Sequence, residues 1–344
     1  MQQQQIQRDQ VKFCYELLSE LTIPQKQVCN AIAFNQNKEL LLVCCDNNIK
    51  VYQFNDGYLK LIQILSKSRF TITVLTFFNY NRKCQFLSGS CDSFIEVRSI
   101  NQLRSQKYIQ KLDSHKRAIS CLVIGQNQKM FLSGSMDQKI KLWSCYQQNQ
   151  GSCQWSCQQT IKGHMNSVYA LDINSKQNKA VSCGYDDKML IMEIIQNMET
   201  YQLVLKQKIS LLNFSFRILF INDSDFIFQS YCGKNLQLLQ QDQNEKYVIT
   251  QFLPVQCKSQ PCNIFFKPQY INSKGFFACK NSQNLNFVYH NPVNNELVLL
   301  YSLSFDNYEQ YGSLSEDGEY LITWDQKLEK IEVRKYKIID DQNN

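Results

Sequence analysis

The chain has 344 residues, which is more than one ordinary globular domain, although all-β and repeat architectures reach this length as a single unit. Hydrophobic residues make up 44% of it, enough for a large core, and the formal net charge of +7 permits acidic partners without requiring them. No apolar segment follows the opening MQQQQIQRDQ, and no apolar run approaches the ~18 residues of a membrane span. We therefore expect no secretory signal and no spanning helix, and a cytoplasmic or nuclear protein whose 15 cysteines are mostly small buried hydrophobes.

In chain order, a polar tail (residues 1–10) is followed by a strand-like run, VKFCYELL, at residues 11–18. This run has no partner within its own part of the sequence. The last strand-like run, KIEVRKYKII, is followed only by a short tail, residues 340–344. Both ends of the chain thus carry strands that need a partner from elsewhere.

Between these ends, one phrase recurs every 45 to 49 residues. An apolar run ends in an Asp, and a short alternating run then ends in a bulky or long side chain six residues later. The Asp positions are Asp46, Asp92, Asp137 and Asp186, and the later positions are Tyr52, Arg98, Trp143 and Met192. Gly233 and Ser282 continue the spacing, and GSLSEDGEYLITWDQKLEKIEVRKY completes a seventh unit. Four short strands in ~45 residues make one propeller blade, so the pattern predicts an all-β chain of seven blades.

Two units share a second spacing that explains their polar residues. His115 precedes Asp137 by 22 residues, and His164 precedes Asp186 by the same number. The Asp carboxylate can accept a hydrogen bond from the imidazole, and the imidazole can accept one from a Ser hydroxyl, Ser133 in one unit and Ser182 in the other. The indole N–H of Trp143 can complete the first network. Because the set recurs at the repeat period, we interpret it as structural rather than as a hydrolase triad.

These motifs resemble the WD40-repeat family, whose unit has a Gly-His pair, a strand ending in Ser-Gly-Ser, a turn Asp and a strand ending in Trp-Asp. The resemblance implies a seven-bladed WD40-type β-propeller in one domain, residues 11–339, with the ring closed by the N-terminal strand pairing with the last blade. Arg98 and Met192 depart from the family's Trp. The one literal Trp-Asp pair, Trp324-Asp325, follows EYLIT and is expected in the turn after that strand.

The sequence offers little for catalysis or cofactor binding. Cys153 and Cys157, with Cys145 and His164 nearby, could be metal ligands, but the C-x3-C spacing lacks a second paired motif. No phosphate-binding, dinucleotide-binding, nucleophile-elbow or zincin motif occurs. We therefore predict a non-enzymatic protein with no catalytic residue, metal or cofactor.

The predicted function rests on the surface. In the family, the residue before the turn Asp tends to face the top entrance of the ring. Those positions here are Cys45, Cys91, Met136, Tyr185 and Cys232, and Tyr169 at a strand start joins them. Such a weakly polar ring suits docking of a peptide or protein, although ordinary half-buried turn residues would have the same composition. We predict a scaffold for protein–protein interaction within a multiprotein assembly.

A basic stretch supplies the alternative. Between the second and third units lie Arg104, Lys107, Lys111, Lys116 and Arg117, expected on an outer strand and rim. These residues could bind nucleic acid, RNA in particular, or an acidic partner. Sparse interleaving with aromatic residues favours a solvated rim instead.

Overall fold

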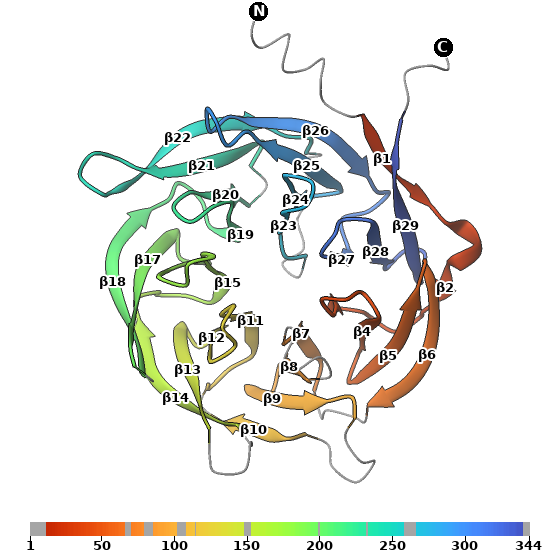
Figure 1. Ribbon diagram of the computed structural model, residues 1–344, viewed down its shortest axis with the longest axis horizontal. Helices are drawn as coiled ribbons and strands as arrows, with labels where there is room; N and C mark the ends of the chain where they lie inside the picture. The colour runs from red at the N-terminus through yellow and green to blue at the C-terminus, as the bar shows by residue number, and fades with distance from the viewer. Residues whose placement is uncertain are drawn as a thin grey trace, which may run out of the picture.

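The computed structural model describes residues 12–65, 70–78, 85–101, 108–113, 115–147, 153–198, 200–231, 233–257 and 266–339. Within them the chain forms 29 β-strands and a three-residue 3-10 helix, η1 (Ser19–Leu21). The strands make seven antiparallel sheets that stand as blades around a central axis, with first strands innermost and fourth strands outermost (Figure 1). The seven-bladed all-β ring predicted from the repeat is confirmed. No helix in these residues is long and apolar enough to cross a membrane.

The first three blades follow the chain order of their strands. Blade 1 consists of β3 (Ile32–Phe34), β4 (Leu40–Cys45), β5 (Asn48–Asn55) and β6 (Tyr58–Leu65). Blade 2 consists of β7 (Ile72–Phe77), β8 (Gln85–Ser90), β9 (Phe94–Ser99) and β10 (Gln110–Asp113). Blade 3 consists of β11 (Ile119–Ile124), β12 (Met130–Ser135), β13 (Lys139–Gln147) and β14 (Cys153–Lys162).

The next three blades repeat this order. Blade 4 consists of β15 (Val168–Ile173), β16 (Lys179–Gly184), β17 (Lys188–Asn197) and β18 (Thr200–Ser210). Blade 5 consists of β19 (Ser215–Phe220), β20 (Phe226–Ser230), β21 (Asn235–Gln241) and β22 (Tyr247–Pro254). Blade 6 consists of β23 (Gln269–Ile271), β24 (Phe276–Asn281), β25 (Asn284–His290) and β26 (Leu297–Ser304).

Blade 7 joins the two ends of the chain. Its own strands are β27 (Gln310–Leu314), β28 (Tyr320–Asp325) and β29 (Lys330–Ile338), and β1 (Phe13–Leu17) pairs with β29 as the fourth strand. A short second segment, β2 (Ile23–Pro24), pairs with the start of β29. The N-terminal strand therefore closes the ring as predicted, and Figure 1 shows β1 beside β29. The predicted tails, residues 1–10 and 340–344, lie outside the described residues.

The closing segment is fixed by buried contacts as well as by strand pairing. The ring of Phe13 stacks on Phe276 of blade 6 at 5.2 Å, and the hydroxyl of Tyr15 donates to the carbonyl of Gly318 at 2.7 Å. Trp324 was expected in a turn, but it lies in β28, where its indole donates to the carbonyl of Gln25 at 2.8 Å. The Trp-Asp pair therefore ends the second strand of blade 7 and anchors the N-terminal segment.

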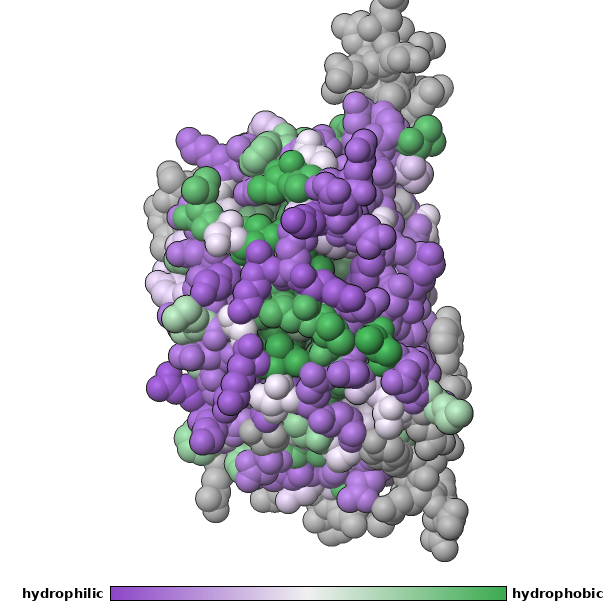
Figure 2. Space-filling model, turned by 90° about the vertical axis from the view of Figure 1, so that its left-hand side faces the viewer, coloured by the Kyte–Doolittle hydropathy of each residue, from purple (hydrophilic) through white to green (hydrophobic). Residues whose placement is uncertain are grey.

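The core is divided among the blade interfaces. The buried apolar side chains described here form seven clusters, one between each pair of neighbouring blades. This arrangement explains why the strands are apolar on both faces, because a blade cannot bury both of its faces without two neighbours. The outer fourth strands instead face solvent. Figure 2, which looks at the side of β18, shows a largely hydrophilic wall with apolar side chains gathered in patches.

Candidate protein-interaction surface

Blade 3 contains the complete polar network that the sequence predicts. The carboxylate of Asp137 lies 3.0 Å from His115 Nδ1, and His115 Nε2 lies 2.7 Å from the Ser133 hydroxyl. The indole of Trp143 donates to the same hydroxyl at 2.9 Å. Asp137 also accepts the backbone N–H groups of Lys116 and Lys139, each at 3.0 Å. The network thus joins the connection into the blade, the turn after β12 and strand β13.

Burial and hydrogen bonding have opposite effects on the pKa values of Asp137 and His115 in this network. Burial alone would raise the pKa of Asp137, but the bonds from His115 and from the backbone of Lys116 outweigh it and hold that pKa at about 2. Burial lowers the pKa of His115, and this effect outweighs the opposing influence of the Asp137 carboxylate. The folded state therefore favours a neutral imidazole bonded to a carboxylate.

Blade 4 repeats the network without the tryptophan. His164 Nδ1 lies 2.9 Å from a carboxylate oxygen of Asp186, and His164 Nε2 lies 2.8 Å from the hydroxyl of Ser182. Asp186 also accepts the backbone N–H of Met165 at 2.7 Å. At the tryptophan position, Met192 is fully buried. The geometry predicted from the 22-residue spacing is present in both blades.

Blades 2 and 7 keep part of this network in a form that the sequence analysis missed. Arg98 in β9 donates to the hydroxyl of Ser88 at 3.1 Å and forms an ion pair with Glu96. Arg334 in β29 donates to the hydroxyl of Thr323 at 2.8 Å and pairs with Glu332 at 2.7 Å.

Each of these arginines occupies the position of Trp143, two residues beyond the partner of the hydroxyl-bearing residue. The signal was present in the sequence as the tetrapeptide IEVR, which occurs at residues 95–98 and again at 331–334.

Neither histidine network has the access that catalysis requires. Ser133 and Ser182 are completely buried, and both carboxylates are held by backbone N–H groups. A nucleophile must reach its substrate, whereas these hydroxyls are bonded inside the blades. A Ser-His-Asp set arranged in this way ties strands together.

The cysteines considered as metal ligands are arranged differently. Cys145 and Cys153 form a disulfide between β13 and β14, with their Cα atoms 5.7 Å apart. The interpretation of the cysteines as small buried hydrophobes therefore does not apply to this pair. Cys157 is exposed in β14, and no group of three potential metal ligands occurs among the described residues.

The top face is the face that carries the turn between the second and third strands of each blade. In blades 2 to 5, four turn residues occupy equivalent positions. Each donates its backbone N–H to the carbonyl of the residue directly before the first strand of its own blade. They are Cys91, Met136, Tyr185 and Tyr231. Cys91 is exposed, Met136 is half-buried, and Tyr185 is 49% exposed. Three of the predicted top-face residues therefore occupy the expected position.

Two predicted top-face positions differ by one residue from the structural equivalence. In blade 1 the first residue after the second strand is Asp46, and its backbone N–H donates to the carbonyl of Val28 rather than to the residue directly before β3. Cys45 is the last residue of β4 and is fully buried, with its sulfur 3.9 Å from that of Cys29. In blade 5 the equivalent residue is Tyr231, and the predicted Cys232 lies outside the described residues. The error arises because turn length varies, and a fixed spacing from the marker residue cannot detect this. Cys45 is thus a core residue.

An aromatic cluster dominates the top face of blades 4 and 5. It consists of five rings, Tyr169, Tyr185, Phe214, Phe216 and Tyr231, and is called here the five-ring cluster. Tyr185 packs on Phe214 with ring centroids 4.2 Å apart, and Phe214 stacks on Tyr231 at 4.7 Å. Tyr169 meets Phe216 edge to face at 4.9 Å. The predicted residues Tyr169 and Tyr185 are therefore brought together, and three further rings join them.

Two exposed apolar side chains lie in the connections that lead into blades 4 and 5. Leu212, two residues before Phe214, is completely exposed, and Met165 in the connection into β15 is 70% exposed. Exposed apolar side chains that gather on one face are typical of interaction sites on soluble proteins. The signal in the sequence was the alternation NFSF at residues 213–216, which places two aromatic residues at the start of a first strand.

The predicted basic rim does not form one surface. Lys111 lies in β10 with its ammonium 3.4 Å from the ring centroid of Phe94. Lys116 and Arg117 are exposed in the connection into blade 3, next to the turn of Asp137. Arg104 and Lys107 lie outside the described residues. The described part of the rim is thus divided between the outer wall and the top face.

Comparison with known proteins agrees with this architecture. The family model described as "WD domain, G-beta repeat" matches residues 16–53, 106–144 and 155–191. The chain is 28% identical over 115 residues to WD repeat-containing protein 82 of Drosophila melanogaster, and this match covers 33% of the chain and 35% of that relative. The chain thus spans about a third of the length of that curated relative.

The fold is also similar to a chain in a solved structure described as "Crystal Structure of Mitotic Checkpoint Complex". The TM-score is 0.72, and the match covers 93% of this chain and 95% of the other at 12% identity. The chain is thus similar to the WD40-repeat family over the three matched repeats, and its fold is that of a closed seven-bladed β-propeller.

Proposed function

We propose that this propeller is a non-enzymatic platform that holds partner proteins within a multiprotein assembly, and that its main docking surface is the five-ring cluster. The cluster carries the proposal because large aromatic rings supply most binding energy at protein interfaces. Tyr169 and Tyr185 combine apolar rings with hydroxyls, and neither hydroxyl has a hydrogen-bond partner among the described residues. The similar solved structure is a mitotic checkpoint complex, and a propeller fold in such an assembly is consistent with a role of this kind.

A comparison of recovered partners tests the proposal. Tagged full-length chain, its Tyr185→Ala variant and a Tyr58→Ala control are used to recover partners for quantitative mass spectrometry. Tyr58 is a suitable control because it is 66% exposed on β6, in the outer wall. We expect Tyr185→Ala to lower partner recovery at least about tenfold, as removal of an aromatic anchor does. Equal recovery by all three proteins, each with an unchanged melting temperature, would reject this surface.

A further inference from the structure

The five-ring cluster depends on an irregularity in the first strands. In blades 2 to 5 the pairing of the first strand skips one residue, which marks a β-bulge at Thr73, Ser120, Tyr169 and Phe216. A bulge changes the direction of a side chain relative to the regular pleat. In blade 2 the Thr73 hydroxyl donates to the carbonyl of Ile119 in the next blade. Blade 3 uses Ser120 in the same way toward Val168.

Blades 4 and 5 use the same position differently. Their bulge residues, Tyr169 and Phe216, are aromatic and contact the rings of Tyr185 and Tyr231 in the turns of the top face. Tyr169 and Phe216 also line the central channel, a cavity of about 400 Å³ enclosed by the first strands of the seven blades. The five-ring cluster is therefore continuous with the entrance of this channel.

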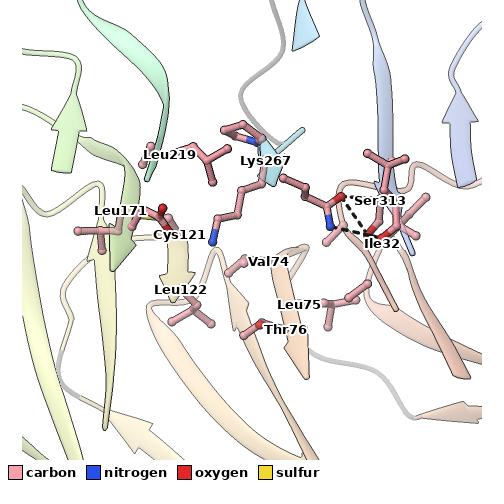
Figure 3. A pocket seen from close by; sticks show the side chains of 18 of the residues that line it. Ile32, Val74, Leu75, Thr76, Cys121, Leu122, Leu171, Leu219, Lys267 and Ser313 are labelled. Atoms are coloured by element: carbon pink, nitrogen blue, oxygen red, sulfur yellow. Dashed lines mark hydrogen bonds between the residues drawn. The ribbon is translucent and has the colours of Figure 1, made fainter. Parts of the chain in front are cut away.

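One lysine extends into the channel. Lys267, two residues before β23, is exposed to the cavity, and Figure 3 shows its nitrogen pointing across the cavity towards Cys121 and Val74. No ion pair to Lys267 is found among the described residues. Two acidic residues, Asp172 and Glu316, also line this cavity. Asp172 is buried, with a carboxylate oxygen 2.8 Å from the backbone N–H of Phe220. Burial raises the pKa of Asp172 despite the nearby ammonium.

Exposed basic side chains outnumber exposed acidic ones in the top-face turns and connections of blades 3 to 5. Lys116 and Arg117 are exposed on the connection into blade 3, and Lys234 is exposed in the turn of blade 5. In the turns of blades 3 and 4, Asp137 and Asp186 are enclosed with side chains only 5% and 3% exposed, whereas Asp187 is exposed. Charge complementarity therefore favours a negatively charged partner.

We propose that the occupant of this surface is an acidic peptide segment with an apolar anchor. The anchor packs on the five-ring cluster beside Leu212, and an aspartate or glutamate side chain enters the channel to pair with the ammonium of Lys267. A carboxylate complements this site, because Lys267 has no ion pair within the described part of the chain and faces apolar walls formed by Val74, Leu122 and Leu219. This inference rests on the proposed function and specifies the chemistry of its partner.

Selection from a random peptide library provides the test. Twelve-residue peptides displayed on phage are selected on the purified full-length protein, and enriched peptides are synthesised for fluorescence polarisation. We expect acidic sequences with a Leu, Phe or Tyr, whose affinity falls as salt increases. Lys267→Gln should weaken them at least about tenfold, as loss of one partner of a desolvated charge pair does. Lys267→Arg should retain binding, and the exposed Lys60→Gln on β6 serves as the matched control.

Charge reversal sharpens the test. Lys267→Glu should abolish binding of the acidic peptides, and replacing their critical acid by Lys should restore affinity for this variant. Neutral or basic peptides that depend on Tyr185 but not on Lys267 would overturn the acidic partner while leaving docking at the cluster intact. Peptides indifferent to both positions would overturn the inference and the proposed function together. Displacement of the peptides by a 20-nucleotide polyuridylate that itself binds more tightly would identify RNA, not an acidic peptide, as the occupant.

Discussion

Blades 2 and 3 are neighbours in the ring, yet the residue that reaches the hydroxyl of the second strand is Arg98 in one and Trp143 in the other. Trp143 belongs to a chain of bonds that ends at Asp137, on the top face. Arg98 instead carries a charge, which is matched within its own strand by Glu96. The comparison shows that the position requires a buried donor, and that either an indole or a guanidinium can supply it.

The Trp143 network and the Arg98 network differ in how much unfolding free energy is lost when one member is replaced. In blade 3 every member is neutral except Asp137, whose charge is stabilised by three donors. In blade 2 the loss of one partner leaves a formal charge with little access to water. We therefore expect the tryptophan blade to tolerate single substitutions better than the arginine blade.

The largest effect is expected for Arg98→Met. It removes the cation beside Glu96 and the donor to Ser88, and breaking a buried pair in this way costs about 3 kcal/mol of unfolding free energy. Glu96→Gln leaves the guanidinium of Arg98, whose side chain is 3% exposed, without its counter-charge, but the amide oxygen can still accept its hydrogen bond, so the expected cost is about 2 kcal/mol. Urea unfolding followed by tryptophan fluorescence measures both. Equal small losses in the two variants would show that the arginine contributes through packing alone.

Asp137→Ala should be next in size. It leaves the imidazole of His115 and the N–H of Lys116 without their acceptor, at about 1–3 kcal/mol. The aligned residue of blade 6, Ser282, lies at the corresponding turn but carries no carboxylate, so Ser282→Ala should lower the unfolding free energy by less than Asp137→Ala does. Thermal unfolding of both variants gives the comparison. Similar losses at the two positions would contradict the assignment of the network to blades 3 and 4.

The sequence was sufficient for the ring, the closing strand and both histidine networks, because each depends on spacing that the repeat preserves. It was insufficient where the length of a turn varies, which explains the misplacement of Cys45. It also failed where a different residue type performs the same task, as Arg98 does in place of a tryptophan. The five-ring cluster joins residues from two blades, and only two of its members could be identified from the spacing.

Transferring the charged pair of blade 2 into blade 3 tests whether a guanidinium can replace the indole there. Blade 3 has Lys141 and Trp143 where blade 2 has Glu96 and Arg98, so Trp143→Arg with Lys141→Glu would transfer the charged pair. Trp143→Arg alone loses the stacking on Phe131 and adds an unmatched charge. The second substitution supplies the partner, and we expect a favourable coupling of about 1 kcal/mol in a double-mutant cycle. Additive losses, measured by urea unfolding, would mean that the pair needs more of blade 2 than these two residues.

The smallest effect concerns the acid stability that the Asp137 network contributes. The pKa of Asp137 is about 2 in the folded protein, below its ordinary value of about 3.9 in an unfolded chain. A carboxyl with a lowered folded pKa stabilises the protein above the unfolded pKa, and this stabilisation is lost as pH falls towards the folded pKa. His115 acts in the same direction at higher pH, because its lowered folded pKa makes protonation below about 6.5 favour the unfolded state.

The difference in unfolding free energy between the wild-type protein and Asp137→Asn should therefore be largest near neutral pH and should narrow between pH 5 and pH 3. Urea midpoints at pH 7, 5 and 3 measure this difference, with Asp187→Asn as a control at an exposed neighbouring turn position. If the difference in unfolding free energy between the wild-type protein and Asp137→Asn instead widens in acid, the predicted sign of the pH dependence is wrong. It would then follow that the His115–Asp137 contact is not what keeps this carboxylate ionised in the folded blade.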